Sequence, residues 1–134
     1  MQPPNMMDYM RLAALVDVAG RITISDKGHV MMRIAAVRKE PISTIAKLFN
    51  GEAWSSPGGY YYWETGTRNG LLPLLKSLQW YVSIMKPQVD LAIEFIEEKI
   101  AIQRRALTQE EREKRRYMIA TIRILNRNAG LENS

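Results

Sequence analysis

Side chains able to ligate a metal ion, or to act as general acids and bases, are few and scattered along this 134-residue chain. The sequence contains no cysteine and a single histidine, His29, which excludes disulfides and cysteine-ligated zinc or iron–sulfur sites. Asp17 and Glu40 are isolated carboxylates. The pairs at 97–98 and 110–111 lie among lysines and arginines, as on solvated ion-pair faces of helices. These residue types therefore form no recognisable catalytic or metal-binding constellation.

Basic and polar side chains alternate with apolar ones over residues 21–36. The two runs, 21–25 and 30–36, flank the turn-forming Asp26-Lys27-Gly28, which predicts a β-hairpin with one apolar and one more polar face. The net charge is +5, and a basic balance favours an anionic partner, most commonly nucleic acid.

The elements that must position these side chains alternate in type. Helices are predicted at 7–18, 41–49, 70–82 and 87–104, the first capped by Asn5. A last helix is predicted from the Thr108/Glu111 capping box to Asn128, closed by Gly130. Strands are predicted at 21–25, 30–36, 52–54 and 60–65. The order α-β-β-α-β-β-α with extra C-terminal helices predicts an α+β fold: one domain, 1–134, with an antiparallel sheet and helices on one face.

No apolar run approaches the roughly 18 residues of a membrane span, and the N-terminal residues lack the features of a signal peptide. We therefore expect a soluble, cytoplasmic protein with no membrane partner.

Residues 12–20, Leu-Ala-Ala-Leu-Val-Asp-Val-Ala-Gly, resemble the nine-residue motif that names the LAGLIDADG homing endonucleases. The agreement is literal at five positions: Leu12, Ala13, Leu15, Asp17 and Gly20. Three further segments, 45–51, 78–96 and 112–130, are similar to family segments in the same order. The resemblance covers nearly the whole chain and is to the single-motif members.

This resemblance implies a homodimer whose motif helices pack together at a two-fold axis, where small side chains allow close approach. The residues it assigns to the dimer interface are Leu12, Ala14, Leu15, Asp17 and Val18. It also implies that the sheet lies as a saddle on the major groove of double-stranded DNA. The side chains expected to contact DNA are Arg21, Thr23, Ser25, Lys27, His29, Met31, Arg33, Arg38, Lys39, Trp54, Tyr60 and Tyr62, with Glu52 and Glu64 facing the same way at a cost to affinity.

The resemblance also indicates that the nuclease chemistry has been lost. Family members carry a metal-binding carboxylate at the eighth motif position, which here is Ala19, and a methyl group cannot coordinate Mg²⁺. Asp17, the sixth position, is expected to be a structural hydrogen-bonding group. Two more positions depart from the family pattern: Arg38 replaces a polar residue, and Met85 stands where a basic residue is common, with Lys86 next to it.

We therefore expect a sequence-specific, non-cleaving DNA-binding protein with no cofactor. We expect it to be a regulator derived from an intron or phage homing endonuclease and bound to the nucleoid. One alternative is an active, Mg²⁺-dependent endonuclease with a rearranged site that uses Asp17 or Glu40. Another is an RNA-binding intron maturase that uses the helical cluster Arg112, Lys114, Arg115 and Arg116. A pure dimerisation protein is the remaining alternative.

Overall fold

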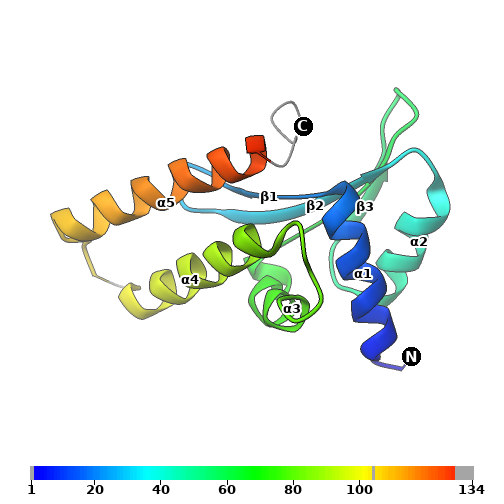
Figure 1. The fold of residues 1–134 in the computed structure, drawn as a ribbon, viewed down its shortest axis with the longest axis horizontal. Coiled ribbons are helices and arrows are strands. Elements are labelled where there is room, and N and C mark those ends of the chain that lie inside the picture. Colours follow the sequence, from blue (N-terminus) through cyan, green and yellow to red (C-terminus); the bar gives the residue numbers. More distant parts are fainter. Residues whose placement is uncertain (1, 104, 129–134) are drawn as a thin grey trace.

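Four antiparallel strands in the order β1-β2-β4-β3 form one sheet, and helices pack on one of its faces (Figure 1). The computed structural model describes residues 2–103 and 105–128. Its elements are α1 (Met6–Ala19), β1 (Gly20–Ile24), β2 (Val30–Ala36), α2 (Lys39–Leu48), β3 (Glu52–Ser55), β4 (Tyr61–Gly66), a 3₁₀ turn (Thr67–Asn69), α3 (Leu71–Leu78), α4 (Lys86–Ile102) and α5 (Gln109–Asn128). The predicted α+β architecture and element order are confirmed, while Gly130 lies outside the described residues.

The two helices with predicted N-terminal caps, α1 and α5, both begin with a capping box. At α1, the Asn5 side chain accepts from the backbone N–H of Asp8, and the Asp8 carboxylate accepts from that of Asn5, both at 2.9 Å. At α5, Thr108 and Glu111 exchange the equivalent pair of bonds at 2.9 and 3.1 Å. Each box satisfies backbone donors that the first turn of a helix leaves free.

The helix predicted at 70–82 is shorter in the structure, where α3 ends at Leu78. The following segment is held by a carboxylate from α1: Asp17 accepts hydrogen bonds from the backbone N–H groups of Ser83 and Met85, both at 2.9 Å. Those contacts hold the chain as a loop that leads into α4. The prediction that Asp17 is a structural hydrogen-bonding group is confirmed.

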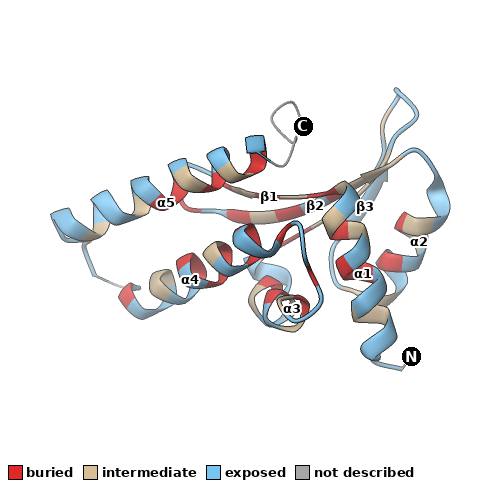
Figure 2. Cartoon of the chain, viewed as in Figure 1, coloured by how far each residue is buried: buried red, intermediate tan, exposed pale blue. Residues whose placement is uncertain are grey.

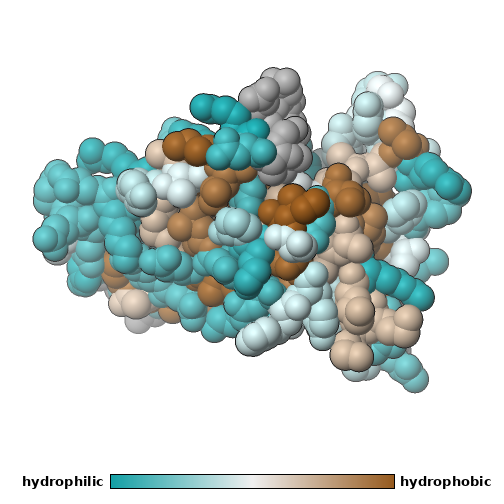
Figure 3. Space-filling view, in the orientation of Figure 1, coloured by the Kyte–Doolittle hydropathy of each residue, from teal (hydrophilic) through white to brown (hydrophobic). Residues whose placement is uncertain are grey.

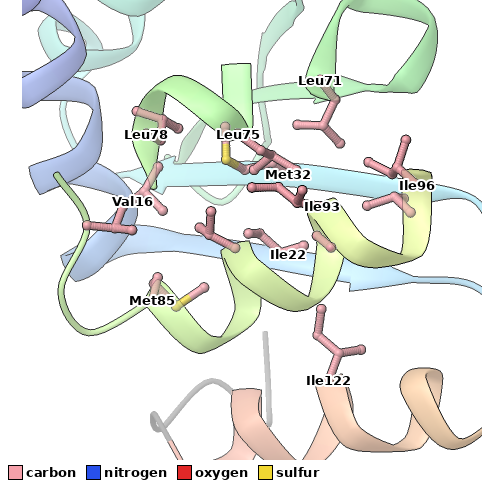
Figure 4. Packing of buried hydrophobic residues seen from close by; sticks show 14 of the residues in the cluster. Val16, Ile22, Met32, Leu71, Leu75, Leu78, Met85, Ile93, Ile96 and Ile122 are labelled. Atoms are coloured by element: carbon pink, nitrogen blue, oxygen red, sulfur yellow. The ribbon is translucent and has the colours of Figure 1, made fainter. Parts of the chain in front are cut away.

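The core lies between the inner face of the sheet and the helices (Figure 2). Val16 from α1, Ile22 and Met32 from the strands, and Leu75 from α3 converge there (Figure 4). Each of these four side chains is fully buried. Burial of one such side chain stabilises a fold by roughly 1.5–3 kcal/mol, so this shared core fixes α1 and α3 on the inner face of the sheet.

Helix α5 packs against α4 and alongside β1, which is an edge strand of the sheet (Figure 1). The Ser25 N–H donates to the carbonyl of His29. The alternation of an antiparallel ladder then directs the backbone groups of Ile22 away from β2, towards the free edge. The Nδ2 of Asn126 donates to the Ile22 carbonyl at 2.9 Å, and its Oδ1 accepts from Gln88 of α4 at 3.4 Å.

Candidate nucleic-acid interface

The outer face of the sheet carries the side chains that alternate with the buried ones. On β1 and β2, the buried residues Ile22, Ile24, Met32 and Ile34 point inwards. Their neighbours therefore point outwards, and these are Arg21, Thr23, Met31, Arg33 and Ala35. On β4, Trp63 and Thr65 are buried, which places Tyr62 and Glu64 on the outer face, opposite Trp54 and Glu52 of β3.

One row of charged residues crosses this outer face from edge to edge. Arg21 pairs with Arg33, Arg33 with Glu64, and Glu64 with Glu52. The row therefore runs from positive at β1 to negative at β3. Like charges directly opposite each other destabilise a sheet. The Arg21–Arg33 pair is relieved on one side only, by Glu64, whose Oε2 lies 2.8 Å from Arg33 Nη2.

Aromatic side chains surround Arg33 on the same face. The rings of Trp54 and Tyr62 are stacked, with centroids 5.3 Å apart and an interplanar angle of 19°. The Arg33 guanidinium lies 5.4 Å from the Trp54 centroid and 5.8 Å from that of Tyr62. Tyr60 approaches Tyr62 at 6.4 Å. Three residues predicted to contact DNA on the second hairpin therefore come together with Arg33.

A cleft of about 650 Å³ separates the outer face of β1–β2 from the C-terminal half of α5. Predicted residues on its sheet side are Arg21, Thr23, Ser25, His29 and Met31. The helix adds two arginines that sequence reasoning missed, Arg123 and Arg127. Their spacing of four residues, which places side chains on one helical face, was the available signal. The buried Nε of Arg21 has no hydrogen-bond partner within residues 2–103 and 105–128.

Four predicted cations do not line this cleft: Arg33, described above, and Lys27, Arg38 and Lys39. Lys27 is exposed in the turn of the β1–β2 hairpin. Arg38 and Lys39 stand beyond the other end of β2, at the start of α2, and both are exposed. Arg38 Nε is 3.9 Å from the Glu40 carboxylate, with both side chains about three-quarters exposed. A pair so open to water contributes little, so Arg38 is available to another anion.

Two of the positions predicted to have lost catalytic groups, Ala19 and Met85, lie at the C-terminal end of α1. Ala19 is the last residue of that helix and packs partly buried against the core. Met85 is buried, and its N–H donates to Asp17. Because Gly20 pairs with Ile34, the end of β2 that leads to Arg38 lies at this same end of the hairpin. In the described part of the chain, no three His, Asp or Glu side chains come close enough to hold a metal ion.

The predicted dimer residues on α1 divide into two groups. Leu12 is buried in the core of its own protomer, and Asp17 is held by the loop before α4. Ala14 and Val18 are exposed, Val18 to 75%, and Leu15 is half-buried. The exposed apolar surface of α1 also includes Met7 and Met10, with Ile84 exposed on the loop that Asp17 holds. Figure 3 shows hydrophobic side chains along α1 and over the loop beside its end.

Comparisons with known proteins bear on the fold. No known protein-family model matches the sequence, and no curated protein is significantly similar to it. Two structures of the homing endonuclease I-CvuI are similar, one in complex with the I-CreI target in Mg²⁺ with the DNA not cleaved, and one in complex with its own target in Ca²⁺. In each, the TM-score is 0.62, the identity is 15%, and the match covers 96% of this chain and 83% of that chain.

The LAGLIDADG meganuclease I-AabMI, bound to uncleaved DNA, matches with a TM-score of 0.63 and 18% identity over 90% of this chain. The match spans 49% of the meganuclease. This chain therefore has the fold of LAGLIDADG homing endonucleases. The resemblance seen in residues 12–20 is supported at the level of the fold, while the low identity leaves activity and partners to be argued from the residues.

Residues 2–103 and 105–128 contain no helix that combines the length and apolarity needed to cross a membrane.

Proposed function

We propose that this chain is a double-stranded DNA-binding protein that contacts DNA through the outer face of β1–β2 and the facing side of α5. The observation that carries the proposal is the cleft between them, whose lining brings together Arg21 of β1 with Arg123 and Arg127 of α5. The similar structures, described as complexes with DNA targets, support the same ligand.

The dimensions of the hairpin fit this ligand. The major groove of B-DNA is about 12 Å wide and admits a two-stranded β-ribbon. With β1–β2 in the groove, Thr23 and Arg33 face base edges, whereas Arg123 and Arg127 stand at the side, where the phosphates run. The negative end of the charged row, Glu64 and Glu52, falls on β4 and β3. We infer that β1–β2 supports the closer contact and that the β3 edge lies further from the phosphates.

We also propose a homodimer formed through α1. The exposed stripe formed by Met7, Met10, Ala14 and Val18 is apolar and continues onto Ile84. An apolar patch of this kind on a soluble protein is typical of an interaction surface. A second copy of the same stripe is self-complementary about a two-fold axis, and two copies would place two hairpins on successive parts of one duplex.

The residues at the end of α1 do not fit a divalent metal ion. Ala19 supplies no ligand, and both oxygens of Asp17 already accept backbone N–H groups at 2.9 Å. Glu40, the other carboxylate that could serve, is on the exposed first turn of α2 beside Arg38. We therefore propose that the protein binds DNA without cleaving it, in the manner of a regulator, and we assign no step to a metal ion. We therefore also propose that the protein is cytoplasmic and associates with the nucleoid when it is bound to DNA.

Selection of binding sites from random duplex DNA tests the proposal, followed by incubation of the selected duplex with Mg²⁺ or Mn²⁺. We expect enrichment of a defined sequence and no strand breaks. Arg21→Gln and Arg127→Gln should weaken binding, while Lys76→Gln, on the distant face of α3 where it pairs with Glu97 at 3.0 Å, should not. Efficient metal-dependent cutting would overturn the non-cleaving part. No salt-dependent affinity for any duplex would overturn DNA binding itself.

A further inference from the structure

A second cavity lies at the tip of the β1–β2 hairpin, where the turn formed by Asp26, Lys27 and Gly28 meets α4 and α5. Its volume is about 180 Å³, several times the roughly 30 Å³ that a water molecule occupies in the liquid. Phe95 and Ile119 supply apolar walls. We call this space, with its lining cations Lys27, Arg112, Arg115 and Arg116, the tip cavity.

Among the residues that the structure describes, one carboxylate lines the tip cavity, and it is already engaged. Asp26 faces four lining cations, and its Oδ1 lies 3.0 Å from Nη2 of Arg123, which approaches from outside the cavity. The lining therefore carries a large excess of positive charge, and its one acidic group is shared with a fifth cation.

Two cations at the cavity are held by neutral oxygens instead of carboxylates. Arg112 Nη2 donates to the carbonyl of Leu107 at 2.9 Å. Lys99, beside the cavity, donates from Nζ to the carbonyl of Gly28 at 2.8 Å. Among the described residues, neither forms an ion pair. Each has its hydrogen bond, but its charge is left without a counter-ion.

Arg115 contacts an aromatic ring, and a neighbouring lysine provides the contrast. The Arg115 guanidinium lies 5.9 Å from the ring centroid of Phe95, a contact that positions it without neutralising it. Lys114, adjacent in sequence but on another face of α5, pairs with Glu98 at 3.2 Å and with Glu94 at 3.7 Å. Within the described residues, Lys114 therefore has carboxylate partners, whereas Lys27, Arg112, Arg115 and Arg116 around the cavity form no ion pair.

The electrostatic consequence is visible at Lys99. Burial lowers the pKa of this lysine, and the nearby positive charge of Arg115 lowers it further. A protonated Lys99 is therefore less favourable here than in water, and the charge of an anion placed in the cavity would favour the protonated form.

We propose that the tip cavity binds a phosphate group. Arg112 and Arg116 are four residues apart on α5, so their side chains share one helical face, and Arg115 stands beside them. Guanidinium groups donate pairs of parallel hydrogen bonds to phosphate oxygens, and three of them with Lys27 surround a tetrahedral anion better than they surround a planar carboxylate. The apolar walls limit competing hydration.

The source of the phosphate follows from the place of the cavity. It lies beyond Ser25 and His29, at the end of the hairpin that faces α5, where a duplex lying on the outer face would continue. A backbone phosphate of that duplex is the source we assign, and this assignment rests on the proposed function. A free phosphate compound has the same chemistry, so the test separates the two.

The first part of the experiment needs no nucleic acid. The protonation of Lys99 is followed by NMR of its Cε and Nζ while tripolyphosphate is added. We expect tripolyphosphate to raise the pKa of Lys99 in the unmodified protein and in Lys114→Gln, and to have no such effect in the Arg112→Gln/Arg115→Gln double variant. An unchanged Lys99 pKa at saturating tripolyphosphate, in a protein shown to be folded by its NMR spectrum, would overturn the site.

The second part measures duplex binding against salt concentration for the same proteins. Each neutralised phosphate contributes about 0.9 to the slope of log K against log salt. The double variant should therefore lose about one unit of slope and keep its sequence preference. If the double variant keeps the slope of the unmodified protein while tripolyphosphate still raises the pKa of Lys99 in the unmodified protein, the cavity does not bind a phosphate of the DNA backbone. The cavity is then assigned to free phosphate compounds. Loss of affinity for structured RNA instead of duplex DNA also overturns it.

These outcomes separate the two proposals. If no duplex binds at all but tripolyphosphate still raises the pKa of Lys99, the proposed function fails and the phosphate site stands. If duplex binding depends on Arg21 and Arg127 but the tip cavity does not respond to phosphate, the site fails and the proposed function stands.

Discussion

The guanidinium of Arg33 on β2 lies against the carboxylate of Glu64 on β4, with Nη2 and Nε at 2.8 and 2.9 Å from the same oxygen. The Glu64 side chain is only 20% exposed, whereas that of Arg33 is 50% exposed. The Glu64 carboxylate is thus part of the sheet surface, and the Arg33 side chain extends outwards from it. In the free protein, Glu64 and the Trp54 and Tyr62 rings hold Arg33 where a bound duplex would have to compete for it.

We predict that Glu64→Gln strengthens duplex binding. The substitution removes a negative charge from the outer face. It also weakens the contact of residue 64 with Arg33, which competes with DNA for the guanidinium. Affinity for the duplex should therefore increase by roughly five- to tenfold, or about 1 kcal/mol. Fluorescence anisotropy at fixed salt measures this. Glu97→Gln removes a carboxylate that pairs with Lys76 away from the sheet and should change affinity little. Weaker binding by Glu64→Gln would instead make the ion pair a positioning contact for Arg33.

The exposed end of α1 gives a test of the dimer. Val18→Arg places two like charges at the proposed two-fold contact, which costs several kcal/mol, so we expect light scattering to report a monomer at concentrations where the unmodified protein is dimeric. Val37→Arg is the matched control, because Val37 is similarly exposed, 69% against 75%, and follows β2. A monomeric unmodified protein, or equal effects of both variants, would contradict the α1 interface.

Asp17 is predicted to stabilise the fold. Asp17→Ala leaves the N–H groups of Ser83 and Met85 without their charged acceptor, and Met85 is buried. Hydrogen bonds to charged groups contribute about 1.5–3 kcal/mol, so we expect urea denaturation to show a loss of about 3 kcal/mol. Asp90→Ala removes an exposed carboxylate 3.4 Å from Lys86 and should cost less than about 1 kcal/mol. A similarly small loss of unfolding free energy in both variants would contradict the structural role of Asp17.

The start of α5 should respond to acid. The Arg105 guanidinium and then the Thr108 backbone N–H lower the pKa of Glu111 from its ordinary 4.5 to about 2. Because the folded pKa is depressed, the stabilisation is complete above the unfolded pKa and is lost as the pH falls from about 4.5 to about 2. Carboxyl ¹³C NMR should place the Glu111 midpoint near 2. Arg105→Gln should move the midpoint upwards, and a midpoint that stays near 2 in that variant would assign the shift to Thr108 alone.

The sequence predicted the elements well wherever the signal was local. The Asn5 cap, the Thr108/Glu111 capping box and the alternation over 21–36 depend on neighbours within a few residues, and the structure has them all. The end of α3 could not be predicted in this way. Leu78 is followed by residues compatible with a helix, but the segment after α3 is bound by Asp17, more than 60 residues earlier, through the amides of Ser83 and Met85.

The candidate site was predictable on the strands and not on the last helix. Period-two alternation placed Arg21, Arg33 and Tyr62 on one face, and the register agrees. The ion pair of Arg33 with Glu64 depends on which strands are neighbours, which alternation does not reveal. Arg123 and Arg127 were missed because their contribution requires α5 to fold back along β1. Leu12 was assigned to the dimer surface by its motif position, whereas the core of its own protomer buries it.

The hydrogen bond from Asn126 to the Ile22 carbonyl has a consequence for how the protein behaves at high concentration. An open strand edge is a template on which another chain can add a strand, and uncontrolled addition leads to fibrils. At β1, the last turns of α5 occupy that edge and satisfy its carbonyl. At the opposite edge, β3 is only four residues long and carries the charge of Glu52. A chain shortened before Asn126 would keep most of its core and expose β1, so α5 also protects the protein against aggregation.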